Sequence, residues 1–238
     1  MRGCLFTLAL GALVIALIVG IGLPRVAAGM VTTAVTAAGL QADDTTVTVS
    51  SDPPTDLIGL HADRVRIRAT DATFRDLAIG ELELELRDVS ILDRSAERVD
   101  GRLSDVTIAD LGGRKVTLDE IAVAGGGDDV TATTVVDGNA AERLIADAVE
   151  QRTGTRPDSV TLRDPDRLVI DAGIEVGGTL DVDGAGNLVL EVDDNPLGLE
   201  EVILLRGGED LPIRLTDVLV TRDGDLQLDG DLAIGLLG

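Results

Sequence analysis

Three arginines spaced two residues apart are the side chains best arranged to bind a charged ligand. Arg64, Arg66 and Arg68 alternate with Val65 and Ile67, and this period of two places the three guanidinium groups on one face of a strand. Guanidinium groups bind phosphate and carboxylate through paired hydrogen bonds. We expect them to form ion pairs with neighbouring Asp and Glu, and we keep phosphate recognition as the alternative.

Side chains that act as nucleophiles, general bases or metal ligands are scarce. The chain has one histidine, His61, one cysteine, Cys4, and no tryptophan or tyrosine. These residues cannot supply a zinc site, a Cys–His pair or an internal disulfide, and we expect the lone imidazole to be structural. The GxSxG, GxGxxG and P-loop patterns are also missing. The sequence therefore predicts a protein that is not an enzyme, without catalytic residues, metal or cofactor.

One acidic segment has part of a calcium-loop pattern. Residues 181–186 read DVDGAG, but the fifth position is Ala185 and the twelfth is Val192, where such a loop needs a bidentate glutamate. We therefore expect a hairpin turn at Asp183-Gly184. Paired acidic residues elsewhere could hold divalent ions loosely, which leaves a calcium-dependent adhesion domain as an open alternative.

The composition excludes several classes of protein. The chain has 43 Asp and Glu against 20 Lys and Arg, a formal charge of −23, so it lacks the basic surface that nucleic acid attracts. With 45% hydrophobic residues it is too apolar to be a disordered acidic tail. Phe6 and Phe74 are its two aromatic residues. We therefore expect a folded domain with an aliphatic core.

The N-terminal region predicts export. Residues 5–23 form an uncharged apolar run that would span roughly 28 Å as a helix, close to the thickness of a bilayer core. We predict a transmembrane anchor over residues 1–23, with a signal peptide cleaved after Ala28 as the alternative. In both cases residues 24–238 form one extracytoplasmic domain, held on the cytoplasmic membrane or secreted to the envelope. Because Arg2 is the one basic residue of the anchor, that domain carries 19 basic residues against 43 acidic ones, a charge of −24.

Two helices are predicted from the spacing of apolar residues. The first lies within residues 25–40, where Gly39 is its predicted stop. The second begins at Asn139, which forms a capping box with Glu142, and ends at Gly154. The apolar stripe of the first helix consists of Val26, Met30, Ala34 and Ala38.

Elsewhere the apolar residues alternate, which predicts strands with one polar face. Turns at Asp183-Gly184 and Asp223-Gly224 make neighbouring strands antiparallel. The alternation reverses near Arg87-Asp88, Asp119-Glu120 and Thr216-Asp217, and each reversal predicts a β-bulge, which bends a strand and increases its twist. The predicted fold class is therefore α+β, mostly β, with a strongly curved antiparallel sheet packed on two helices.

Three stretches resemble the LmeA-like family of actinobacterial cell-envelope proteins. Residues 57–59, followed by the strand with Val65 and Ile67, and residues 79–89 (IGELELELRDV) carry part of the resemblance. Residues 211–226 (LPIRLTDVLVTRDGDL) resemble the family's closing hairpin more closely. The resemblance implies an exported phospholipid-binding protein with a sheet wrapped around helices, similar to tubular (BPI-like) lipid-binding folds. It also implies a role in the assembly of envelope lipids or lipoglycans.

We therefore expect a non-enzymatic phospholipid-binding domain that holds acyl chains between the sheet and a helix. Its partners would be phospholipid or another acyl lipid and, through residues 5–23, the membrane; nucleic acid is excluded. An envelope interaction or scaffold domain with a filled core is the alternative, because filled and hollow interiors both need alternating aliphatic residues. Headgroup recognition would fall to Arg64, Arg66 and Arg68. The candidate acyl contacts, which could equally be plain core, are Val65, Ile67, Leu82, Leu84, Leu86, Leu168, Ile170, Ile213 and Leu215.

Overall fold

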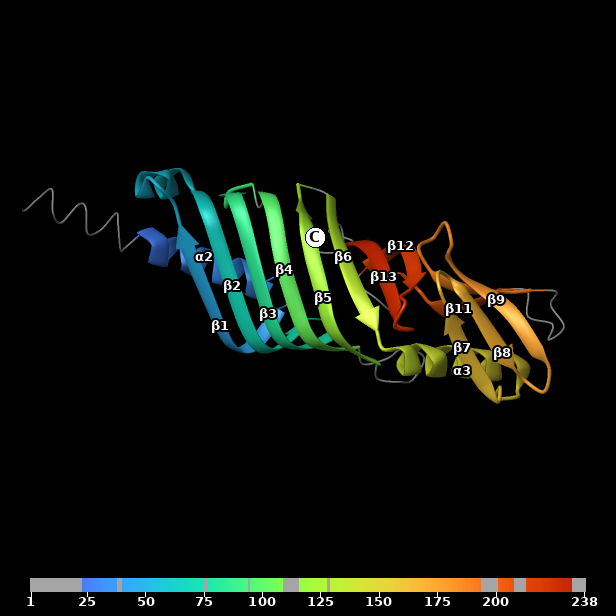
Figure 1. Cartoon of the computed structure of the whole chain (residues 1–238). Coiled ribbons are helices and arrows are strands. Elements are labelled where there is room, and N and C mark those ends of the chain that lie inside the picture. The colour runs from blue at the N-terminus through green and yellow to red at the C-terminus, as the bar shows by residue number, and fades with distance from the viewer. Residues whose placement is uncertain are drawn as a thin grey trace, which may run out of the picture.

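Two antiparallel sheets follow one another along an elongated molecule (Figure 1). The structure, a computed structural model, describes residues 23–37, 40–74, 77–93, 95–108, 116–127, 129–193, 201–207 and 213–232. Cys4 and residues 5–22 of the predicted anchor lie outside these ranges. The predicted mostly-β fold with antiparallel strands is confirmed, since every pairing between the described strands is antiparallel.

The first sheet has eight described strands and includes both the early strands of the chain and its last two. The last strand pairs with the sixth, so the C-terminal part of the chain completes a sheet that the N-terminal part begins. In spatial order its strands are β1 (Leu40–Ser50), β2 (His61–Phe74), β3 (Leu77–Ser90), β4 (Ser95–Ile108), β5 (Val116–Gly126), β6 (Asp129–Val136), β13 (Leu226–Leu232) and β12 (Ile213–Val220).

The second sheet lies between β6 and β12 in the sequence and has five described strands. In spatial order they are β11 (Glu201–Leu205), β10 (Leu188–Val192), β9 (Glu175–Val182), β8 (Arg167–Asp171) and β7 (Ser159–Arg163).

Helix α3 (Gly138–Thr153) joins the two sheets in sequence and packs against β7 and β11. Its predicted end at Gly154 is confirmed, with a φ of 75°. The predicted N-cap was wrong: Asp137 and not Asn139 caps the helix, and its carboxylate accepts a hydrogen bond from the Ala140 N–H at 3.1 Å. A carboxylate satisfies a free N–H and also interacts favourably with the positive end of the helix dipole, which explains the earlier start.

Helix α2 (Leu23–Ala37) lies across one face of the first sheet, followed after β1 by the short 3₁₀ helix η2 (Pro54–Gly59). The predicted helix ended later, but Leu40 is already the first residue of β1. The apolar stripe was also misplaced. Val26 and Met30 are 58% and 48% exposed, whereas Ala27 is buried against the sheet. The side of the helix that carries Ala27, Ala28 and Val31 packs on the sheet, so Val26 and Met30 face outward.

Buried aliphatic residues form two clusters. The larger one, here called the main core, joins residues of both sheets and α3, including Ile145, Leu168 and Leu226. The smaller one lies between α2, η2 and the first three strands and is here called the α2 seam. Its buried members are Ala27, Val49, Leu57, Ala62, Val65, Ile67 and Val89.

All three predicted reversals of the alternation are present, but of these three only the one in β12 is a β-bulge. There Thr216 and Asp217 are both exposed and the register with β13 shifts. Asp119 and Glu120 in β5 are also both exposed between buried neighbours, and the inward positions of β3 change parity around Asp88, which has a φ of 51°. The registers of β3 and β5 with their paired neighbours nevertheless continue unchanged past these two points. The neighbouring strands carry a matching irregularity, so the bulges predicted in β3 and β5 were wrong.

The strong curvature expected from these bulges is not found (Figure 1). A reversal near Gly80 in β3 faces one near Asp105 in β4, and the register before and after this point is unchanged. A matched irregularity in both strands keeps their lengths equal, so little curl accumulates between them. The expected packing of one sheet on two helices was also wrong, because α2 lies on the first sheet and α3 packs on the second.

The bulge in β12 allows a direct test of backbone packing. Gly230 in β13 faces it, and a β-carbon there would lie 2.5 Å from the Arg214 carbonyl oxygen. We expect Gly230→Ala to lower the free energy of unfolding by roughly 1–3 kcal/mol, measured by urea denaturation. The matched control is Gly29→Ala, because nothing lies within 4 Å of its added carbon and alanine should favour the helix by about 0.5–1 kcal/mol. Equal stability of the two variants would contradict the observed contact.

Candidate functional site

The structure divides the nine candidate acyl contacts among different environments. Val65 and Ile67 are buried in the α2 seam, and Leu84 and Leu86 are half-buried beside it. Leu82 belongs to the main core. These five side chains share the inner face of β2 and β3, as the alternation predicted.

The remaining four candidates lie in the main core, away from α2. Leu168 and Ile170 are almost completely buried in β8 of the second sheet, and Ile213 and Leu215 are buried in β12. Their environment is that of closed packing, and the structure does not bring them together with the α2 seam into one site.

A row of half-buried aliphatic residues crosses the inner face of β3 and β4. Leu86 lies opposite Val99 and Leu82 lies opposite Leu103, while Leu84 contacts both buried clusters. We call Leu84, Leu86, Val99 and Leu103 the inner strip. The sequence analysis missed Val99 and Leu103, although their spacing on either side of Gly101 has the period of a strand.

Gly101 gives the inner strip its local shape. It lies opposite Leu84, and a β-carbon at position 101 would collide with Cδ2 of that leucine. Because Gly101 has no side chain, the Leu84 side chain can extend over the backbone of the neighbouring strand β4.

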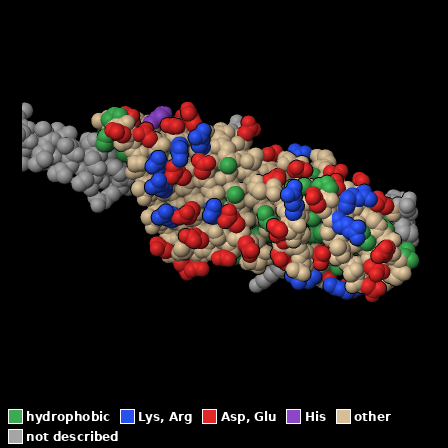
Figure 2. Space-filling view, viewed as in Figure 1, with side chains coloured by type: hydrophobic (Ala, Val, Ile, Leu, Met, Phe, Trp, Pro, Cys, Tyr) green, Lys and Arg blue, Asp and Glu red, His purple; other side chains and the backbone are tan. Residues whose placement is uncertain are grey.

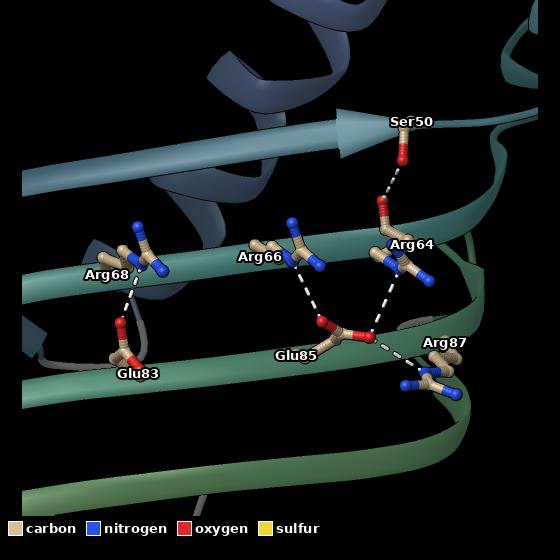
Figure 3. A network of polar contacts seen from close by, with 7 residues as sticks. All are labelled: Ser50, Arg64, Arg66, Arg68, Glu83, Glu85 and Arg87. Atoms are coloured by element: carbon tan, nitrogen blue, oxygen red, sulfur yellow. Dashed lines mark hydrogen bonds and ion pairs between the residues drawn. The ribbon is translucent and has the colours of Figure 1, made fainter.

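The arginine stripe lies on the opposite, outer face of β2, where the expected ion pairs are confirmed (Figure 3). Arg66 Nε lies 2.9 Å from Glu85 Oε2, and Arg64 Nε lies 3.2 Å from Glu85 Oε1. Arg87 Nε approaches the same Oε1 to 2.9 Å, and Arg68 Nε lies 2.8 Å from Glu83 Oε1. Figure 2 shows basic and acidic side chains interleaved over this face.

Glu85 is the centre of this network. Its carboxylate receives hydrogen bonds from Arg66 and Arg87, which hold the pKa of Glu85 below its ordinary value of 4.5 against the opposing effect of desolvation. Arg64 adds a further electrostatic contribution in the same direction. One carboxylate thus reduces the repulsion among three guanidinium groups.

The stripe and the α2 seam cannot contact the same part of one ligand. Arg64 and Arg66 point to the outer face, whereas Val65 and Ile67, which alternate with them, point to the inner face. A strand sends successive side chains to opposite sides of its sheet. The two halves of the expected lipid site are therefore separated by the sheet itself, and the stripe stays a candidate phosphate contact on the outer face.

Two surface hollows lie away from the candidate acyl contacts. One of about 260 Å³ lies over β5 and β6, between Asp119, Glu120, Asp137 and Asp225. The other, an open depression of about 590 Å³, lies beside η2 and includes His61. The exposed imidazole places Nδ1 3.3 Å from the Gly59 carbonyl oxygen.

The hairpin expected at Asp183 is confirmed. Its carboxylate accepts hydrogen bonds from the N–H groups of Ala185 and Asn187 at 2.8 and 2.9 Å, and from the Asn187 amide at 2.8 Å. The hydrogen bonds from Asn187 are the main cause of the lowered pKa of Asp183. Asp183, the third position of the partial calcium-loop pattern, thus closes the β9–β10 turn.

Metal-binding groups and membrane-spanning helices are both missing from the described part of the chain. Within the described ranges, no group of three or more His, Cys, Asp or Glu side chains is placed to hold a metal ion. The helices in this part of the chain are too short or too polar to cross a membrane.

No family model, curated protein sequence or solved structure matches the chain.

The central role of Glu85 predicts a pH-dependent stability. Because its pKa is lowered in the folded state, its charge stabilises the fold above about its ordinary pKa, and this contribution disappears as the pH falls through the lowered value. We expect Glu85→Gln to reduce the free energy of unfolding at pH 7, with a smaller loss at high salt and at pH 3. Urea denaturation measures the difference.

Glu83→Gln is the matched control, because Glu83 pairs with one arginine and is 48% exposed, compared with 22% for Glu85. The control should lose less stability at pH 7. Equal losses for the two variants at every pH would show that Glu85 does not hold the network together.

Proposed function

We propose that the chain is a non-enzymatic, extracytoplasmic lipid-binding protein that holds an acyl chain between α2 and the inner strip. The observation that carries the proposal is a half-covered aliphatic face on the long first sheet, next to a helix that packs on it with small side chains. This arrangement offers apolar surface that an acyl chain could cover without displacing polar groups.

The contact between α2 and the sheet is apolar. Ala27, Ala28 and Val31 face the α2 seam, while the described threonine hydroxyls of α2 bond within the helix, as Thr32 does to the Ala28 carbonyl at 2.9 Å. An acyl chain inserted along this contact would replace one apolar neighbour by another. The seam is therefore the part of the fold that could open for a lipid at small cost.

The strength of binding would come from buried acyl carbon. Each buried methylene group contributes ~0.8 kcal/mol, so two additional methylene groups should tighten binding about tenfold. The charge of −23 would oppose adsorption to an anionic membrane, and salt would weaken that repulsion. We therefore propose recognition of the chain more than of the headgroup.

The setting of the protein is also part of the proposal. The apolar residues 5–23 would hold the domain on the outer side of the cytoplasmic membrane, or release it to the envelope if they are cleaved. Long antiparallel strands with an apolar inner face and a covering helix support a relation to tubular, BPI-like lipid-binding folds. The resemblance to LmeA-like proteins supports a role in envelope lipid or lipoglycan assembly.

A filled scaffold domain is the second candidate. It is favoured by the nearly complete burial of Val65, Ile67, Leu168 and Ile170, which leaves no room around those four side chains. In that case the half-covered inner strip would be an ordinary edge of the core, and the acidic surface would contact a basic protein or cell-wall cations.

Lipid retention discriminates between the two candidates. The full chain is purified in a detergent in which bound lipid can exchange with added lipid. We expect native mass spectrometry to show one bound phospholipid, whose affinity rises with acyl length. Leu86→Gln should lower retention while the fold is kept, because Leu86 is only half-buried. The matched control is Leu219→Gln on β12, where the leucine is 38% exposed.

The scaffold candidate predicts a different outcome. If no lipid is retained at any acyl length and Leu86→Gln changes only the unfolding midpoint, lipid binding by the inner strip is wrong. Equal loss of lipid in both variants would place the lipid elsewhere.

A further inference from the structure

Exposed apolar side chains gather at one end of the first sheet. Val26 is 58% exposed, Ile58 66% and Leu92 73%. Each of them follows or precedes a residue that packs in the α2 seam, so consecutive apolar residues send one side chain inward and one outward. The inward partners are Ala27 in α2, Leu57 in η2 and Ile91 in the β3–β4 turn.

These three positions belong to one end of the molecule. Ala27 and Leu57 share the α2 seam, and the Ile91 N–H donates to the Leu60 carbonyl oxygen at 2.9 Å, which ties the β3–β4 turn to the end of η2. Figure 1 places η2 and the start of α2 at the same end, and Figure 2 shows apolar side chains over η2 there. Met30 is 48% exposed and lies one helical turn after Val26 on the same face of α2. We call Val26, Met30, Ile58 and Leu92 the apolar end.

Other exposed large apolar residues in the described part of the chain are spread over the molecule. They are Val135, Ile174, Ile203 and Leu219, on β6, the β8–β9 turn, β11 and β12. Scattered apolar residues are normal on protein surfaces, whereas a group of them marks a contact. The apolar end is therefore the surface whose covering needs an explanation.

We infer that the apolar end rests on the surface of a phospholipid bilayer. The uncharged apolar residues 5–22 lead directly into α2, whose first turn carries Val26. A chain held in a bilayer by that run would bring η2 and the β3–β4 turn to the lipid surface, with the second sheet farthest away. This orientation rests on the anchor of the proposed function and not on lipid uptake by the seam.

Charge indicates which lipids this surface meets. Asp56 and Asp93 lie within two residues of Ile58 and Leu92, but Arg25 and Arg94 lie equally close to Val26 and Leu92 in the sequence. Repulsion by an anionic leaflet at low salt therefore comes from the charge of −23 on the chain as a whole. Zwitterionic phospholipid would not repel it. In this orientation the α2 seam would lie next to the bilayer, from which a phospholipid could enter it. Ala27, Leu57 and Ile91 line the seam at the end nearest the bilayer.

The absence of tryptophan from the sequence makes the test specific. Single-tryptophan variants Ile58→Trp and Leu92→Trp of the full chain are placed in phosphatidylcholine nanodiscs. We expect their fluorescence to shift to shorter wavelength and to be quenched by brominated phosphatidylcholine but little by iodide. Ile174→Trp is the matched control, since Ile174 is 50% exposed in the second sheet; its fluorescence should be quenched by iodide and not by bromolipid.

Three outcomes would overturn the inference. Equal bromolipid quenching at positions 58, 92 and 174 would show that this end is not preferred. Protection from iodide without bromolipid quenching would mean that protein, from this chain or a second copy, covers the apolar end. Failure of the chain to enter nanodiscs would contradict the proposed membrane anchor. Lipid binding between α2 and the inner strip is tested separately, by lipid retention in native mass spectrometry.

Discussion

The division of each long strand into an aliphatic face and a charged face is the constraint on which the structure depends. The chain has two phenylalanines and no tryptophan or tyrosine, so its core consists of Val, Leu, Ile and Ala, which bury less area per residue than aromatic side chains. These aliphatic residues are spread over the strands of both sheets, where they form the two buried clusters.

The same alternation separates charge from apolar contact. On the outer face the guanidinium groups of Arg64, Arg66 and Arg87 share Glu85, and on the inner face Val65 and Ile67 lie under α2. A single layer of β-sheet separates the two sets of side chains. The charged surface and the aliphatic surface of this part of the sheet thus lie on opposite sides.

The parts of the fold that depend on local pattern were predictable, and the parts that depend on long-range pairing were not. The hairpin at Asp183 and the bulge at Thr216-Asp217 follow from residue types and parity within a few positions. By contrast, the separate second sheet depends on β13 pairing with β6, and nothing local indicates that. The outward turn of Val26 depends on how closely Ala27 approaches the strands, which a helical stripe alone does not determine. At the candidate site, alternation identified Leu84 and Leu86, but the division into two clusters follows from the tertiary packing.

The pairing of β13 with β6 has a consequence for synthesis. All of α3 and the second sheet, including Ile145 and Leu190, come between these two strands in the sequence. Until residues 226–232 have been synthesised, β6 presents an open edge to which other chains can add a strand. The first sheet therefore cannot be completed while the chain is still growing, and its early strands are exposed to pairing with other copies until the last strands are available.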